Sequence, residues 1–386
     1  MKIQIGNKRR NKKVLAGEGE YPKVLASVGV SSKEDSIVEE VEKAKLAQKY
    51  GADIVIDHTL TLDNYEVQKR IIEETDIAIS SIAVYDMAAK SRFGTKGFYD
   101  ANEVLKGIEA KAQLGLDLMT IHASVLKKDL EFFYNSQRVI PCTSRGGTMV
   151  LENIKKTGQE NFYYTHFDDI LDIAKEYGVV ISLGAIYRPA NIYDAINENS
   201  MYWEEISRNA ELVERAKAKG VSCMVEGIGH CPINLIPAIV KKSKEICKAP
   251  YRVLTVATDS ALGFDHVSSA IAVSTAVMAG ADFVTAVSRS EHLGLPKIED
   301  LKEAVISAKI AAHCGYIART GDITLDYSMA KKRSEVGCRG SIKSAIVPEM
   351  TKEALERHKS CEDKKCTMCG DFCALFSSDK IKEGVR

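Results

Sequence analysis

Short runs of apolar, mostly β-branched residues recur along the chain, and stretches with a 3.6-residue apolar repeat separate them. A glycine often closes the helix-like stretch before the next run, as at Gly178 and Gly220, where a helix C-cap is expected. The strand-sized runs are residues 24–28, 53–57, 77–84, 118–122, 179–183, 222–226, 253–257 and 283–287. Eight strands alternating with helices predict an α/β fold in which a parallel sheet closes into a (β/α)8 TIM barrel. An open doubly wound sheet is the alternative, but no GxGxxG follows the first run.

The alternation stops near Met329, and the charge density then rises. We therefore expect three parts. An N-terminal arm covers residues 1–21, and the (β/α)8 barrel covers residues 22–329. A C-terminal segment over residues 330–386 begins with helix-like sequence and continues into a cysteine-rich, cluster-binding stretch.

Composition narrows the possible partners. The 386 residues include 53 basic and 53 acidic side chains, so a net charge of zero argues against nucleic acid or an anionic membrane as a partner. The apolar runs are too short to span a bilayer, and residues 1–13 are basic without the apolar stretch of a signal peptide. We expect a cytoplasmic protein that acts on a small molecule.

Polar residues gather where the predicted strands end. Active sites of such barrels lie at the carboxyl ends of the strands, so these residues predict a site there. A single histidine at a strand end is usually no more than a hydrogen-bonded residue, but several on one rim favour function. Asp265 and His266 stand apart within a loop and could be structural. The rim residues are Asp57, His58, His122, Arg188, Glu226, His230, Asp259, Arg289, Glu291 and His292.

The stretch Ser144-Arg145-Gly146-Gly147 lies between the fourth and fifth runs. Backbone N–H groups of consecutive glycines, together with a guanidinium, can bind a phosphate. Glycine pairs are usually just turns, and only the place of this one on the predicted rim favours an anion site.

His230 and His292 are the best metal candidates. Neutral imidazole suits zinc or iron, and two histidines leave coordination positions for water or substrate. The two residues follow different strands, so only closure of the barrel could bring them together.

Four of the ten cysteines crowd into residues 361–373. Cys366, Cys369 and Cys373 form a Cys-x2-Cys-x3-Cys stretch, and three thiolates can hold a [4Fe-4S] cluster with one iron open. The alternative is a structural zinc knuckle completed by Cys361 or His358.

Together these motifs resemble the ThiC family of radical S-adenosylmethionine enzymes, which includes thiamine pyrimidine synthases and 5-hydroxybenzimidazole synthases (Bza proteins). The resemblance implies a (β/α)8 barrel with a C-terminal cluster-bearing segment, in a homodimer. It also implies rearrangement of 5-aminoimidazole ribotide with S-adenosylmethionine, a [4Fe-4S] cluster and an external electron donor. The segments that carry it are TIHASVL (120–126), SRGG (144–147), ENFYYTHFDDI (160–170), EGIGHCP (226–232), DSALGFDH (259–266), SEHLGLP (290–296), KIAAHCG (309–315) and CTMCGDFC (366–373).

The resemblance also implies roles for individual residues. His230 and His292 match the family's zinc ligands, and Cys366, Cys369 and Cys373 match its cluster thiolates. The positions that match substrate-binding residues are Tyr99, His122, Ser144, Arg145, Gly146, Arg188 and Glu226.

The chain departs from the family at several points. Residues 184–190 read GAIYRPA where the family has GDGLRPG, Arg252 replaces a tyrosine, and the last cysteine spacing is one residue short. The lost carboxylate and the added guanidinium predict a more cationic pocket. Our leading hypothesis is a radical lyase that converts 5-aminoimidazole ribotide to 5-hydroxybenzimidazole for the cobamide lower ligand. The alternatives are a thiamine pyrimidine (hydroxymethylpyrimidine phosphate) synthase, an enzyme of this family with another substrate, and a catalytically silent subunit that pairs with a paralogue.

Overall fold

The computed structural model describes residues 1–32, 36–92, 101–340, 342–357, 368–374, 377, 378 and 381. The chain divides into two compact units, Met1–Arg319 and Thr320–Arg386, and each is described by itself. None of the helices in the described part of the chain is long and apolar enough to cross a membrane.

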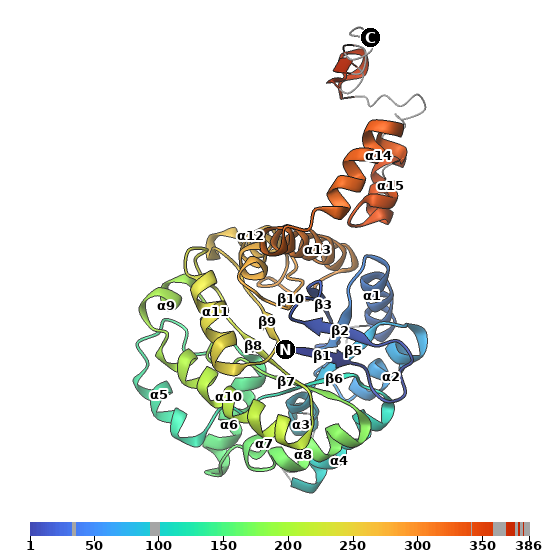
Figure 1. Ribbon diagram of the computed structural model, residues 1–386. Helices are drawn as coiled ribbons and strands as arrows, with labels where there is room; N and C mark the ends of the chain where they lie inside the picture. The colour runs from blue at the N-terminus through green and yellow to red at the C-terminus, as the bar shows by residue number, and fades with distance from the viewer. Residues whose placement is uncertain are drawn as a thin grey trace. The chain divides into compact units, whose positions relative to one another are not determined.

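Eight parallel strands close into a barrel in the first unit, which confirms the predicted (β/α)8 fold (Figure 1). The barrel closes at Val284, which pairs with Val24 on one side and with Val253 on the other. The strands are β3 (Lys23–Val28), β4 (Ile54–Asp57), β5 (Ala78–Ile82), β6 (Leu118–Ile121), β7 (Val180–Leu183), β8 (Cys223–Gly227), β9 (Tyr251–Val253) and β10 (Phe283–Thr285).

Helices surround the barrel (Figure 1), and the longer ones, such as α8 and α10, bury an apolar face. The predicted glycine caps are present, since Gly178 and Gly220 end two of these helices in the left-handed conformation at a φ of 75°. The helices are α1 (Ile37–Lys49), α2 (Asn64–Glu74), α3 (Ala83–Arg92), α4 (Ala101–Leu114), α5 (Leu130–Asn135), α6 (Arg145–Thr157), α7 (Phe162–Thr165), α8 (Phe167–Tyr177), α9 (Ile192–Asn197), α10 (Ser200–Lys219), α11 (Ile236–Cys247), α12 (Asp265–Met278) and α13 (Ile298–Thr320).

Strand β9 differs from its prediction. The apolar run 253–257 was expected to be the strand, but the strand is Tyr251–Val253. The residues that follow, Leu254, Thr255 and Val256, line a cavity instead. An apolar run in the sequence indicates only that the residues are buried. A run that lines a cavity therefore looks the same in sequence as a run that forms a strand.

The N-terminal residues form an antiparallel hairpin of β1 (Lys2–Ile5) and β2 (Val14–Gly17). The buried carboxylate of Asp117, which directly precedes β6, holds the following residues: it accepts from Asn7 N at 2.8 Å and from Arg10 Nε at 2.7 Å. This chain segment therefore packs at the amino ends of the strands, and the carboxyl ends stay open for a site.

The second unit contains α14 (Thr324–Gly340), α15 (Pro348–Arg357) and a short 3-10 turn, η4 (Gly370–Phe372). Cys369 and Cys373 stand on either side of η4, the first exposed and the second buried, and neither forms a disulfide. Cys366 lies outside the described residues, as do Cys361 and His358 of the alternative zinc knuckle.

Candidate active site

A cavity of about 280 Å³ opens at the carboxyl ends of the barrel strands. The predicted substrate-binding residues that the structure describes all line it, and so do both predicted metal ligands. The structure therefore brings together predicted residues from four separate strand ends, those of β6, β7, β8 and β10. Tyr99 lies outside the described residues. The predicted residues on the wall are His122, Ser144, Arg145, Gly146, Arg188, Glu226, His230 and His292.

The SRGG stretch forms the N-terminus of α6 at this cavity. Ser144 is the N-cap, and its Oγ accepts from Gly147 N at 3.1 Å and lies 3.2 Å from His122 Nε2. A Cβ on Gly146 would lie 2.3 Å from His122 Cε1, and one on Gly147 would lie 2.6 Å from Ile186 Cγ2. The two glycines are thus required by close packing. The N–H of Gly147 is already bonded to Ser144, so the first N–H groups of α6 that could bind an anion are those of Arg145 and Gly146.

Arg145 contributes a guanidinium that pairs with no carboxylate in the described part of the chain. Its Nε donates to Tyr85 Oη at 3.0 Å, its charge stands over the Tyr85 ring at 5.2 Å, and its Nη2 lies 3.5 Å from His58 Nδ1. Tyr85 was not among our candidates. It directly follows the predicted strand 77–84, so the strand-end argument applies to it as well.

Two histidines in the wall, the buried His122 and the half-buried His58, are uncharged at neutral pH. Burial lowers the pKa of His58 to about 3, and Arg145 and Arg252 lower it further. Burial also lowers the pKa of His122 to about 4, against the opposing effect of Glu226. Their rings can make hydrogen bonds to a ligand, but they add no positive charge to the cavity.

A buried ion pair contributes to the wall of the cavity. Glu226 of β8 accepts from Arg252 of β9 at 2.6 Å, from Ser182 at 2.7 Å and from Thr120 at 3.2 Å. Arg252 also donates its Nε to Thr285 at 3.0 Å. Burial tends to raise the pKa of Glu226, but the attraction of Arg252 and the Ser182 hydrogen bond outweigh it, so the pKa is lowered and the carboxylate is ionised.

This pair changes the expected source of positive charge. Arg252 was expected to make the pocket more cationic, but Glu226 compensates its charge. Arg188 donates to the backbone oxygen of Ala185 and, like Arg145, forms no ion pair within the described residues. The guanidinium groups in the cavity wall that are not compensated by an ion pair are therefore those of Arg145 and Arg188; Glu291 also lines the cavity and opposes their charge.

A buried carboxylate accepts hydrogen bonds from the backbone of the loop that carries Arg188. Glu205 of α10 accepts from Ile186 N at 2.7 Å, from Tyr187 N at 2.8 Å and from Ser124 Oγ at 2.9 Å. Burial raises the pKa of Glu205 to about 7. The GAIYRPA departure thus replaces an acidic position with side chains that pack inward, since Ala185, Ile186 and Tyr187 are all buried.

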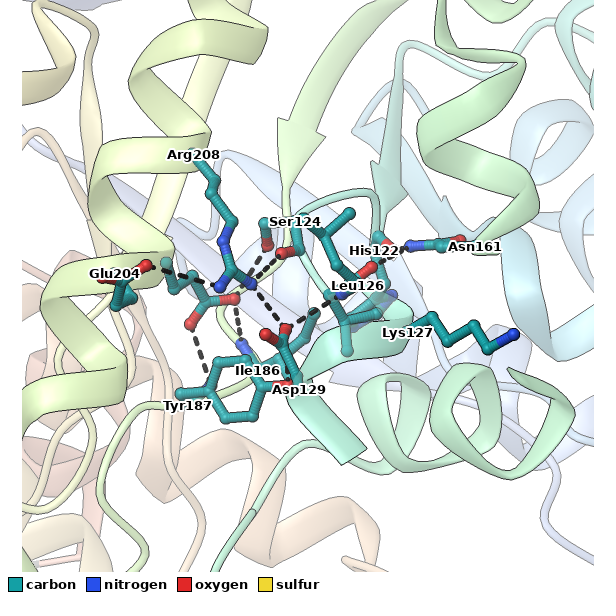
Figure 2. A network of polar contacts seen from close by, with 12 residues as sticks. His122, Ser124, Leu126, Lys127, Asp129, Asn161, Ile186, Tyr187, Glu204 and Arg208 are labelled. Atoms are coloured by element: carbon teal, nitrogen blue, oxygen red, sulfur yellow. Dashed lines mark hydrogen bonds and ion pairs between the residues drawn. The ribbon is translucent and has the colours of Figure 1, made fainter. Parts of the chain in front are cut away.

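Figure 2 shows the neighbouring contacts that fix the loops after β6 and β7. Asp129 accepts from Tyr187 Oη at 2.9 Å, from Arg208 at 2.5 Å and from Leu126 N at 2.9 Å. Asn161 Nδ2 donates to the backbone oxygen of His122 at 2.9 Å. Asn161 of the ENFYYTHFDDI motif therefore supports His122 of the cavity wall from outside the cavity.

His230 and His292 lie side by side, with ring centroids 5.2 Å apart. Nδ1 of His230 lies 2.6 Å from Asp259 Oδ1, and Nδ1 of His292 lies 3.0 Å from Asp265 Oδ1. Because a carboxylate only accepts, each Nδ1 carries a proton, and in the neutral form of each ring the lone pair for a metal is on Nε2. Asp265, for which the sequence alone suggested a structural role, orients a candidate ligand.

This donor set fits a divalent metal. Both rings line the cavity, and burial lowers the pKa of His230, which favours the neutral imidazole that a metal needs. Among the described residues, no three His, Cys, Asp or Glu side chains are grouped to hold a metal ion. Two imidazoles would therefore need water or a bound ligand to complete the coordination.

Comparison with known proteins identifies the family. Residues 1–380 match the model of the radical SAM ThiC family. Phosphomethylpyrimidine synthase of Archaeoglobus fulgidus is 40% identical over 92% of this chain and 83% of its own length. The proteins of the same name are 39% identical over 95% of this chain and 87% of their own in Methanocaldococcus jannaschii, and 36% identical over 100% and 88% in Geobacter metallireducens. A radical SAM enzyme of this kind implies S-adenosylmethionine and a [4Fe-4S] cluster. The chain belongs to the radical SAM ThiC family.

Proposed function

We propose that this chain is a phosphomethylpyrimidine synthase, a lyase that rearranges 5-aminoimidazole ribotide to the pyrimidine phosphate of thiamine. The name shared by relatives that are 36–40% identical supports this reading over benzimidazole formation, which the sequence departures had favoured. The observation that carries the proposal is the cavity itself, because the N-terminus of α6 with Arg145 and the ionised Glu226 both line it.

The phosphate of the ribotide would bind at the N-terminus of α6. Ser144, Arg145 and Gly146 line the cavity there, and Arg145 has no carboxylate partner in the described part of the chain. A guanidinium and helix N–H groups together suit a phosphate dianion.

The heterocycle would bind against Glu226. Arg252 keeps this carboxylate ionised, and its hydrogen bonds from Arg252, Ser182 and Thr120 all reach Oε1. Oε2 therefore stays available to accept from a ring or amino N–H. Neutral His122 and the guanidinium of Arg188 would orient the ribotide from either side.

The cofactors would be held by residues from both units. Zn2+ (or Fe2+) would bind His230 and His292, and the [4Fe-4S] cluster would bind Cys366, Cys369 and Cys373. When bound, the cluster would supply the electron that cleaves S-adenosylmethionine. We also propose that an external donor reduces the cluster and that the chain forms a homodimer or pairs with a paralogue.

The test is anaerobic incubation of the reconstituted full chain with 5-aminoimidazole ribotide, S-adenosylmethionine and a reductant. The proposal predicts 5′-deoxyadenosine that appears only when the ribotide is present. An Arg145→Gln variant should bind the ribotide at least about tenfold less tightly, because a charge-assisted hydrogen bond is lost. If neither 5′-deoxyadenosine nor a rearranged product forms, the proposal fails and the silent-subunit reading takes its place.

Benzimidazole formation is the second candidate. The buried apolar side chains of GAIYRPA and the Glu226–Arg252 pair alter the wall that faces the heterocycle, and both changes suit a different product. Mass spectrometry of the product separates the two readings.

A further inference from the structure

The loops that follow β7, β8 and β9 are bonded to one another at the edge of the cavity. His230 N donates to Pro189 O at 3.0 Å, and Cys231 N donates to Val256 O at 3.1 Å. A Cβ on Gly229 would lie 2.1 Å from the same Pro189 oxygen. The segment that carries His230 thus rests directly on the segment that carries Arg188.

One carboxylate links these segments a second time. Asp259, in the loop after β9, bonds through Oδ1 to His230 Nδ1 at 2.6 Å and through Oδ2 to Ile192 N at 2.8 Å. Ile192 is the first residue of α9, four positions beyond Arg188. The two oxygens of Asp259 therefore join the candidate metal ligand to the segment of the candidate ribotide-binding arginine.

Asp265 offers a built-in comparison. It orients His292 as Asp259 orients His230, with Nδ1 to Oδ1 at 3.0 Å. Within the described ranges its other oxygen accepts only a long hydrogen bond from Gly263 N, at 3.4 Å, inside its own loop. Among the described residues it makes no hydrogen bond to the Arg188 segment.

We infer that Asp259 is a positioning residue that couples metal binding at His230 and His292 to ribotide binding at Arg188. A metal on Nε2 makes the Nδ1 proton of His230 a stronger donor to Asp259, which fixes the carboxylate that also holds Ile192 N. The coupling is reciprocal. Bound ribotide therefore raises the affinity for the metal by the same factor by which bound metal raises the affinity for the ribotide. The inference rests on the proposed function for the identity of the ligands.

The experiment measures two dissociation constants on the metal-free full chain by calorimetry. One is for Zn2+ with and without 5-aminoimidazole ribotide, and the other is for the ribotide with and without saturating Zn2+. In the wild type, saturating Zn2+ should lower the dissociation constant of the ribotide by about fivefold or more, which is the lower end of ordinary coupling. We call this ratio of dissociation constants the coupling factor. Asp259→Asn and Asp265→Asn should each lower the affinity for Zn2+ by about 10- to 100-fold. Asp259→Asn should also reduce the coupling factor to about one. Asp265→Asn should keep the wild-type coupling factor when it is measured at a Zn2+ concentration that saturates the variant.

Ile192→Pro isolates the link without touching a histidine partner. Proline lacks the N–H that Asp259 accepts, and it is tolerated at the first position of a helix. The preceding Asn191, at φ −157° and ψ 163°, already has the extended backbone that proline requires. We expect unchanged Zn2+ affinity and a coupling factor of about one.

The outcomes separate this inference from the proposed function. If Asp259→Asn or Ile192→Pro keeps the wild-type coupling, or if Asp265→Asn loses it equally, the inference is wrong while the proposed function stands. If the zinc-loaded wild type binds no ribotide, the proposed function fails as well. Wild-type ribotide affinity that is independent of Zn2+ overturns the inference alone.

Discussion

The ion pair in the cavity wall makes the most quantitative prediction. Arg252 and Glu226 are 3% and 6% exposed, and their charged atoms lie 2.6 Å apart. Replacing Arg252 with leucine would leave Glu226 buried without its cationic partner, with the hydroxyls of Ser182 and Thr120 as its remaining donors among the described residues. Breaking one partner of such a pair costs about 3–5 kcal/mol of folding free energy.

The double variant tests whether the uncompensated charge is the cause. Glu226→Gln combined with Arg252→Leu removes both charges, and replacing a whole buried pair is often neutral or stabilising. We therefore expect the double variant to recover most of the stability that Arg252→Leu loses. Urea unfolding of the full chain, followed by circular dichroism, measures both.

A matched arginine serves as the control. Arg215 pairs with Asp168 at 3.2 Å, but the two side chains are 28% and 57% exposed. Arg215→Leu should cost less than about 1 kcal/mol, as is usual for surface pairs. The reasoning is refuted if Arg252→Leu costs no more than this control, or if the double variant is as unstable as the single one.

Three further predictions concern the cavity. Gly146→Ala should abolish ribotide binding in calorimetry, because its Cβ would lie 2.3 Å from His122 Cε1, whereas Gly294→Ala, with nothing within 4 Å, should bind normally. Arg145→Gln should also lower the affinity for inorganic phosphate by about tenfold. Equal affinity in the variant and the wild type would argue against the anion site. Because burial lowers the pKa of His58 to about 3 and of His122 to about 4, the unfolded chain binds protons that the folded chain does not. The stability that these two histidines contribute should therefore fall as pH drops below about 6.5, and His58→Gln should reduce the loss of urea midpoint between pH 7 and pH 5; an unchanged loss would contradict the pKa assignment.

The barrel was predictable because its strands are short apolar runs and the helices between them show a 3.6-residue apolar repeat. The rim was predictable because parallel strands of a barrel all end at one face. The sequence therefore predicts that His122, Arg188, Glu226, His230 and His292 lie together, and all five line the cavity. The error at β9 has the same origin, since an apolar cavity wall and an apolar strand look alike in sequence.

Pairings between loops and strands could not be predicted. Glu226 and Arg252 face each other only because β8 and β9 pair in this register. The bonds of Asp259 to His230 and of Asp265 to His292 join residues 29 and 27 positions apart, and nothing in the local sequence specifies them. Such contacts depend on the closure of the barrel, which sequence periodicity predicts only as a topology.

The most direct test of the central claim is the mass of the product that the reconstituted full chain forms from 5-aminoimidazole ribotide under anaerobic, reducing conditions. The account predicts the pyrimidine phosphate, accompanied by 5′-deoxyadenosine and absent with a Cys369→Ser variant. 5-Hydroxybenzimidazole in its place, or no product from a chain with an intact cluster, would contradict the account.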